Sequence, residues 1–151
     1  DDQGEAEENR ISAFGYSFTY PENWTQTDTV QEDKQVAIRP EGEEDGPNFV
    51  SVQRFDIGYD YEDNRDRFIT ELQNRLEETG RNIKRFKPDD VFAGRPVITY
   101  IETSGDTATV WLVIAKDDKQ LSIGCQWGGD AREKVESACE QVVRTIRFTG
   151  E

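Results

Sequence analysis

The sequence predicts an α+β fold in which a mostly antiparallel β-sheet lies between two helices. Three observations lead to this prediction. The segment 107–115 alternates like a strand but has apolar residues on both of its faces. A second strand follows it after a short polar turn, and two other segments repeat apolar residues at three- and four-residue steps, as amphipathic helices do. A strand with two apolar faces must be covered on both sides, so we expect the two helices to cover opposite sides of one sheet.

The segment from Thr107 to Ala115 is predicted to be the central strand. Its two apolar sets are Trp111, Val113 and Ala115 on one face and Val110, Leu112 and Ile114 on the other. Lys116 to Lys119 form a polar turn, and the chain returns with an apolar face made of Leu121, Ile123, Cys125 and Trp127. Gly128-Gly129 ends this second strand, which places Cys125 on a face that must be buried.

A terminal helix is predicted after Gly129. Asp130 stands three residues before Glu133, which favours Asp130 as the N-cap in a relative of the capping box. The apolar stripe comprises Ala131, Val135, Ala138, Cys139, Val142 and Ile146. Folding this helix back onto the preceding hairpin brings Cys139 close to Cys125.

The N-terminal part divides into a tail and the start of the domain. Residues 1–10 hold five carboxylates and almost no apolar side chain, so we expect a disordered acidic tail or linker that is dispensable for folding, followed by a single α+β domain over 11–151. Alternating aromatic residues predict one strand from Ile11 to Tyr20. Pro21 to Trp24 is then a turn that returns a tryptophan to the core.

Two short strands, 35–39 and 48–55, are predicted to form a hairpin. The loop between them, Glu41 to Pro47, carries four carboxylates. It lacks the spaced aspartates of an EF-hand, so a solvated acidic loop is favoured over a calcium loop. No metal site is therefore assigned.

The first long helix is predicted to include Tyr61 to Leu76 and to end before Gly80, a natural residue for the position after a helix. Tyr59 and Tyr61, beside acidic residues, could form a recognition patch, but aromatic packing at the start of the helix is the favoured interpretation. Residues 83–87 are predicted to be an edge-like strand, and 97–103 a strand that forms a hairpin with the central one.

The composition excludes several functions. The chain has no histidine, which removes Ser-His-Asp triads, histidine-paired cysteines and most zinc sites. With 32 acidic against 18 basic residues, the net charge of −14 disfavours nucleic acid and anionic lipid surfaces as partners.

The sequence contains no run of about 18 apolar residues, the length needed to span a membrane. Because there is also no methionine, we expect a fragment whose upstream part could carry a signal peptide or anchor.

The two cysteines leave two interpretations open. Their placement favours a disulfide in an oxidising compartment, and the alternative is a pair of buried free thiols in a cytosolic protein. A redox switch is disfavoured because switch cysteines are usually exposed. The only site residues assigned from the sequence are therefore Cys125 and Cys139, as a structural disulfide.

The Gly124-Cys125-Gln126 strand and the later Ala138-Cys139 segment of the terminal helix form a distinctive pair. In these segments the chain resembles the C-terminal domain of actinobacterial type VII secretion-associated proteins, and the similarity covers roughly Phe18 to Phe148. The Tyr20-Pro21-x-x-Trp24 segment resembles the broader PsbP-like fold, to which a Ran-binding nuclear transport factor and several actinobacterial lipoproteins belong. The other similar segments are 92–97, Val110-Trp111, 120–123 and Val142-Val143. The resemblance implies a PsbP-like α/β/α sandwich, a membrane segment upstream and a location outside the cytoplasm, with no catalytic residue and no cofactor to carry over.

These observations predict a non-enzymatic extracytoplasmic accessory domain of a type VII secretion system, with protein partners that include secretion-system components. Its contact with a membrane would be made only through an upstream anchor. The alternative is a lipoprotein-like envelope module that binds a small ligand or a cell-envelope component. A hydrolase based on two carboxylates is the third hypothesis, and it is disfavoured because no carboxylate lies in a recognisably apolar pocket.

Overall fold

The computed structural model describes residues 9–149, which contain ten strands and two helices. The helices are α2 (Arg65–Glu78) and α3 (Arg132–Thr145). The strands are β1 (Asn9–Ala13), β2 (Tyr16–Tyr20), β3 (Trp24–Val30), β4 (Gln35–Pro40), β5 (Phe49–Asp56), β6 (Asn82–Phe92), β7 (Arg95–Ser104), β8 (Thr107–Lys116), β9 (Lys119–Gly128) and β10 (Arg147–Phe148).

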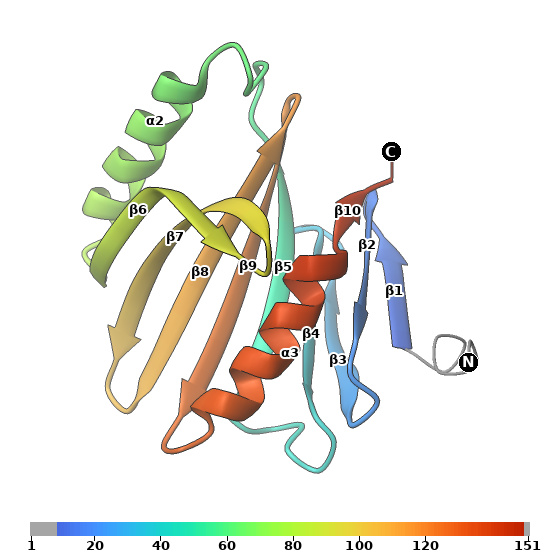
Figure 1. Cartoon of the computed structure of the whole chain (residues 1–151). Coiled ribbons are helices and arrows are strands. Elements are labelled where there is room, and N and C mark those ends of the chain that lie inside the picture. Colours follow the sequence, from blue (N-terminus) through green and yellow to red (C-terminus); the bar gives the residue numbers. More distant parts are fainter. Residues whose placement is uncertain (1–8, 150–151) are drawn as a thin grey trace.

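Seven strands form the main sheet in the order β3-β4-β5-β9-β8-β7-β6 (Figure 1). Every pair of neighbours in this sheet is antiparallel, as predicted. The sheet consists of two up-and-down units, which we call the first meander (β3 to β5) and the second meander (β6 to β9). They meet where β5 pairs with β9.

A small sheet of order β1-β2-β10 packs beside α3 (Figure 1). The single strand expected from Ile11 to Tyr20 is instead a hairpin, because Phe14 and Gly15 both have positive φ and turn the chain. Asn9 and Arg10, assigned to the tail from the sequence, belong to β1. The first eight residues of that predicted tail lie outside the described residues.

Strand β8 contributes to two separate hydrophobic cores, as its two apolar faces predicted. One core contains α3, the small sheet and the β8 residues Val110, Leu112 and Ile114. The other contains α2 and the β8 residues Trp111, Val113 and Ala115. Burial of apolar area in the two cores supplies the main driving force for the fold.

Three further sequence predictions need correction. Strand β3 was not expected, because it alternates threonine with polar residues instead of apolar ones. The edge strand predicted for 83–87 continues to Phe92, and it accommodates Pro88 because its pairing with β7 is irregular between Lys87 and Asp90. Asp130 is not the N-cap of the terminal helix; Ala131 occupies that position, with no side-chain capping bond.

Arg95 connects the β6–β7 hairpin to the end of α3. Its guanidinium donates hydrogen bonds to the carbonyl oxygens of Val143, at 2.8 Å, and Ile146. Carbonyls in the last turn of a helix have no partner within the helix, so Arg95 supplies one from a distant hairpin. Neither α2 nor α3 is long and apolar enough to cross a membrane, and residues 9–149 contain no other helix.

Candidate functional site

The predicted cysteine pair is a disulfide between β9 and α3. Cys125 and Cys139 are joined with their Cα atoms 6.1 Å apart, and both are almost completely buried. The alternative of two free thiols is therefore wrong for this structure. Since neither sulfur is accessible, the bond acts as a staple that holds α3 on the sheet.

The acidic loop 41–47 does not gather its carboxylates around one point. Glu43 accepts hydrogen bonds from Lys134 Nζ at 2.5 Å and Asn48 Nδ2 at 3.1 Å, and the bond from Lys134 is the main reason that its pKa is lowered. Glu44 turns back to accept a bond from the backbone amide of Gly42. The loop is thus fixed to α3 by an ion pair.

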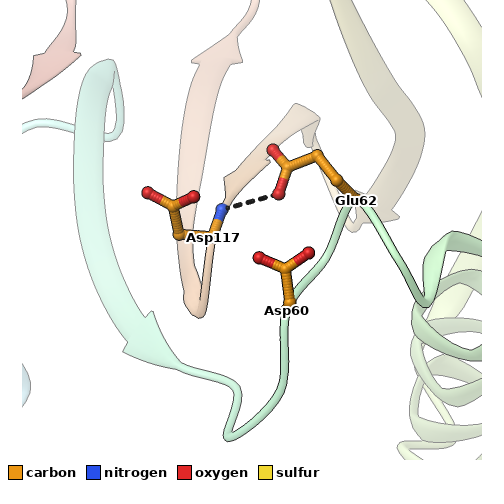
Figure 2. Close-up of side chains that lie close together, drawn as sticks. All are labelled: Asp60, Glu62 and Asp117. Carbon is orange, nitrogen blue, oxygen red and sulfur yellow. Dashed lines mark hydrogen bonds between the residues drawn. The ribbon is translucent and has the colours of Figure 1, made fainter.

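A different group of carboxylates lies close together at the turn between β8 and β9 (Figure 2). Asp60, Glu62 and Asp117 are exposed, and each places a carboxylate oxygen within 4.8 Å of those of the other two. The sequence did not predict this cluster, because Asp117 is more than fifty positions from the other two residues.

Hydrogen bonds account for much of the arrangement of this cluster. The Glu62 carboxylate accepts a bond from the backbone amide of Asp117 at 3.1 Å (Figure 2). The amide of Tyr61 donates to the carbonyl of Asp117 at 2.7 Å, and the Asp60 carboxylate accepts from the amide of Asp63. These contacts fasten the β8–β9 turn to the segment before α2. Three exposed carboxylates supply only part of the six to eight oxygens that Ca²⁺ prefers.

Tyr59 and Tyr61 pack at the start of α2, which agrees with the interpretation of aromatic packing favoured from the sequence. Tyr61 meets Phe68 edge to face, with ring centroids 5.2 Å apart. The ring of Tyr59 lies under the guanidinium of Arg67, and its hydroxyl donates to Glu71. Both rings therefore support the helix.

A groove of about 480 Å³ lies between α2 and the main sheet. Such a volume falls within the range of small-molecule sites. Its apolar walls are Phe68, Leu72 and Leu76 from α2, Tyr100 from β7 and Phe55 from β5. Gln120 and Ser122 of β9 line it with polar groups, and they are hydrogen-bonded to each other at 2.9 Å.

The polar residues of the groove carry both signs of charge. Asp56 and Glu71 contribute carboxylates, and Arg75 and Arg81 contribute guanidinium groups. Tyr100 is 5 % exposed, and the pKa of its phenol is raised mainly by burial. The phenol of Tyr100 therefore stays protonated and can donate a hydrogen bond.

Sequence reasoning missed this groove. The signal was present in β9, where Gln120, Ser122 and Gly124 alternate with apolar residues, but we assigned no role to that polar face. In the structure these three residues are buried, because α2 and Trp111 lie on the same face. Small side chains that face bulky ones leave space for a groove. Which residues face each other is known only from the fold.

The shifted carboxyl groups give no sign of a catalytic acid. Glu43, Asp56, Glu71 and Asp90 are the described carboxyl groups whose pKa values shift, and all four shift downward through hydrogen bonds to their carboxylates. A glycosidase-type general acid needs a pKa that is raised. These four carboxylates are therefore held in their ionised form and are not poised as general acids.

Among the solved structures that this chain resembles, three align with nearly all of it. CyanoP, the PsbP protein of the cyanobacterium Synechocystis, aligns over 95% of this chain and 93% of its own, with a TM-score of 0.57 and 18% identity. LpqN of Mycobacterium tuberculosis, described as involved in cell envelope biogenesis, aligns over 94% of this chain and 90% of its own, with a TM-score of 0.56 and 12% identity.

The third structure is a protein of Bacteroides thetaiotaomicron, with a TM-score of 0.56 and 11% identity. It aligns over 96% of this chain, which spans only 50% of that protein. No protein-family model and no curated protein matches the sequence. This chain therefore has the PsbP-like fold, whereas the resemblance to type VII secretion-associated proteins is not shown.

Proposed function

We propose that this chain is a non-enzymatic, extracytoplasmic accessory domain of the cell envelope that acts through protein contacts. The observation that carries the proposal is the buried disulfide between Cys125 and Cys139, in a fold shared with LpqN, which is described as involved in cell envelope biogenesis. Structural disulfides persist in oxidising compartments and are rare in the cytosol. The bond and the fold thus support the same location.

The chemistry of the chain supports a role without catalysis. Histidine is absent from the sequence, and both cysteines are bonded. The carboxyl groups with shifted pKa values are held ionised by their partners. Acid–base and nucleophilic mechanisms need a side chain whose pKa or reactivity is tuned for the reaction, whereas binding needs no such side chain.

The more specific form of the proposal is an accessory domain of an actinobacterial type VII secretion system, anchored to the membrane through an upstream segment. It rests on the resemblance of the Gly124-Cys125-Gln126 and Ala138-Cys139 segments to that family. With it we propose the α/β/α sandwich of the PsbP-like fold, with α2 and α3 on the two sides of the main sheet. The two hydrophobic cores around β8 support this arrangement.

Photo-crosslinking of the full-length protein in its own cells tests the proposal. Benzoylphenylalanine at Val30 and Val91, two of the exposed large apolar residues, samples two edges of the main sheet. We expect adducts with membrane components of the secretion machinery. Adducts with unrelated envelope proteins would contradict the type VII role, and alkylatable cysteines in protein taken directly from cells would contradict the extracytoplasmic location.

Binding of a small ligand is the second candidate function. The groove between α2 and the sheet favours it, because apolar walls with a few convergent polar groups are typical of ligand sites. The same domain could bind a partner protein and a small ligand, because Val91, one of the two positions chosen for crosslinking to a partner, lies outside the groove.

A further inference from the structure

We propose that the groove between α2 and the main sheet binds an amphipathic carboxylate, with its apolar chain along α2 and its carboxylate at Arg75. The inference rests on the second candidate function and names the class of ligand. It is argued from the groove's apolar walls and from the balance of charge among its lining residues.

The walls fit an aliphatic chain. Phe68, Leu72 and Leu76 present one side of α2 to the groove, and the Tyr100 ring faces them from β7. Phe55 stands at the margin with 40% of its surface exposed. An apolar ligand that covers Phe55 would remove this surface from water, which favours binding.

Partners inside the protein already satisfy the carboxylates that line the groove. Asp56 accepts from Arg54 at 3.1 Å and Lys34 at 3.2 Å. Glu71 accepts from Arg67 at 3.0 Å and from the Tyr59 hydroxyl at 2.9 Å. A ligand cation would therefore have to compete with bonds that exist.

Arg75 is the cation of the groove lining that forms no ion pair. Arg81 lies 3.4 Å from Glu102, but Arg75 forms no ion pair with any residue of the described range 9–149. It is exposed in the last turn of α2. Arg75 lowers the pKa of Glu71 through its charge, but that carboxylate is already bonded to Arg67 and to the Tyr59 hydroxyl. A cation that forms no ion pair beside an apolar groove can therefore bind an anion at this place.

A helix dipole offers the competing explanation for Arg75, because cations in the last turn of a helix are stabilising wherever they lie. Arg144 separates the two explanations. It is the exposed basic residue in the last turn of α3, and it does not line the groove. The same substitution at Arg75 and at Arg144 removes the same interaction with a helix dipole, but only the substitution at Arg75 changes the groove.

The test compares three eight-carbon amphiphiles on the 151-residue chain by two-dimensional NMR: octanoate, octyltrimethylammonium and octyl glucoside, each below its micelle concentration. We expect octanoate to shift the amides of Thr79, Gln120 and Ser122 and to bind more tightly than the other two. The cation is a stringent control, because the net charge attracts it to every other part of the surface. Arg75→Gln should weaken octanoate roughly tenfold, as loss of a charged hydrogen bond predicts, and Arg144→Gln should leave it unchanged.

The outcomes separate this inference from the function on which it rests. If octyl glucoside shifts the groove amides as well as octanoate does and Arg75→Gln has no effect, the groove binds apolar ligands but the assignment of a carboxylate is wrong. If none of the three probes shifts these amides, both the inference and the second candidate function are contradicted. Equal losses in Arg75→Gln and Arg144→Gln would show a general effect of charge and would also overturn the inference.

Discussion

The indole ring of Trp111 lies directly over the backbone of Gly124 on the neighbouring strand. A Cβ atom added to Gly124 would stand 2.7 Å from Cζ3 and 2.9 Å from Cη2 of that ring. The two residues are cross-strand partners in the β8–β9 ladder, and the indole nitrogen donates a hydrogen bond to Glu102 at 2.9 Å. The ring is therefore held at a place where the opposite residue can have no side chain.

Gly124→Ala should destabilise the domain by about 1–3 kcal/mol, because the new methyl group must displace a ring that is anchored at its nitrogen. Gly128→Ala is the matched control on the same strand, where the nearest atom would be 3.5 Å away. Urea unfolding followed by tryptophan fluorescence measures both. Adding Trp111→Leu to Gly124→Ala should restore part of the loss, and equal stabilities of the two alanine variants would contradict the contact.

Replacing Cys125 and Cys139 together by alanine should lower the free energy of unfolding by about 3 kcal/mol in the chain-entropy model. The loop that the bond closes has a sequence separation of 14. Serine at both positions should cost more than alanine, since it places hydroxyls in an apolar layer. Intact-mass measurement with alkylation establishes the bond first; two reactive thiols in non-reduced protein would refute it.

Arg95→Ala should destabilise the protein by about 1.5–3 kcal/mol, because it removes charged hydrogen bonds to the last carbonyls of α3. Arg144→Ala is the control: it lies at the same helix end but is exposed, and it should change stability by less than about 0.5 kcal/mol. Hydrogen exchange adds a local test. Protection in the last turn of α3 should fall in the Arg95 variant, and unchanged protection there would contradict the capping role.

Asp90→Asn should reduce the loss of stability in acid. Its carboxylate accepts bonds from Thr99 Oγ1 at 2.7 Å and from the amide of Val91 at 2.9 Å, and these bonds lower its pKa in the folded state. A lowered folded pKa contributes stability that is present above the unfolded pKa, about 4, and is lost as pH falls through the folded value. The difference in unfolding free energy between wild type and variant should therefore be up to ~1 kcal/mol at pH 6 and shrink toward pH 2.

The matched control for this pH dependence is Asp106→Asn, at an exposed turn. Within residues 9–149 its carboxylate accepts no hydrogen bond, so Asp106→Asn removes a charge without removing such a bond. A difference for Asp90→Asn that grows as pH falls would show that the sign of the proposed linkage is wrong.

Calorimetric titration with Ca²⁺ should show no micromolar affinity. The carboxylates of Asp60, Glu62 and Asp117 are exposed, and Glu43 in the acidic loop is already paired with Lys134. Two variants identify the site if tight binding is nevertheless found. Its loss in Asp60→Asn would place the ion at the β8–β9 turn, and its loss in Glu43→Gln would place it in the loop 41–47.

The local features of the fold could be predicted because single segments encode them. The two apolar faces of β8 and the apolar stripe of α3 lie in the sequence itself, and so does Gly80, which follows α2 with positive φ. The pairing of Cys125 with Cys139 followed from a hairpin and a helix that are adjacent in the chain.

Features that join distant segments could not be predicted. Nothing near Arg95 indicates that it reaches the end of α3, and nothing in β9 shows that Gln120 and Ser122 lie beneath α2. Strand β3 escaped notice because threonine is β-branched but not apolar, so its alternation gives no hydrophobic signal. The groove depends on the approach of α2 to β7 and β9, which are distant from it in the sequence.

The junction of the two meanders has a consequence for the order in which the chain folds. Within each meander, consecutive strands are joined by short turns, but β5 and β9 come together across a long separation; the bond from the Gly128 amide to Asn48 Oδ1 spans 80 residues. Contacts of long separation form slowly because the ends of a long loop must meet first. The disulfide, with a separation of 14, lies entirely on one side of this junction. Formation of the disulfide therefore does not require the β5–β9 junction to close first, and the slow steps of folding should be those that join the two meanders and bring the small sheet to α3.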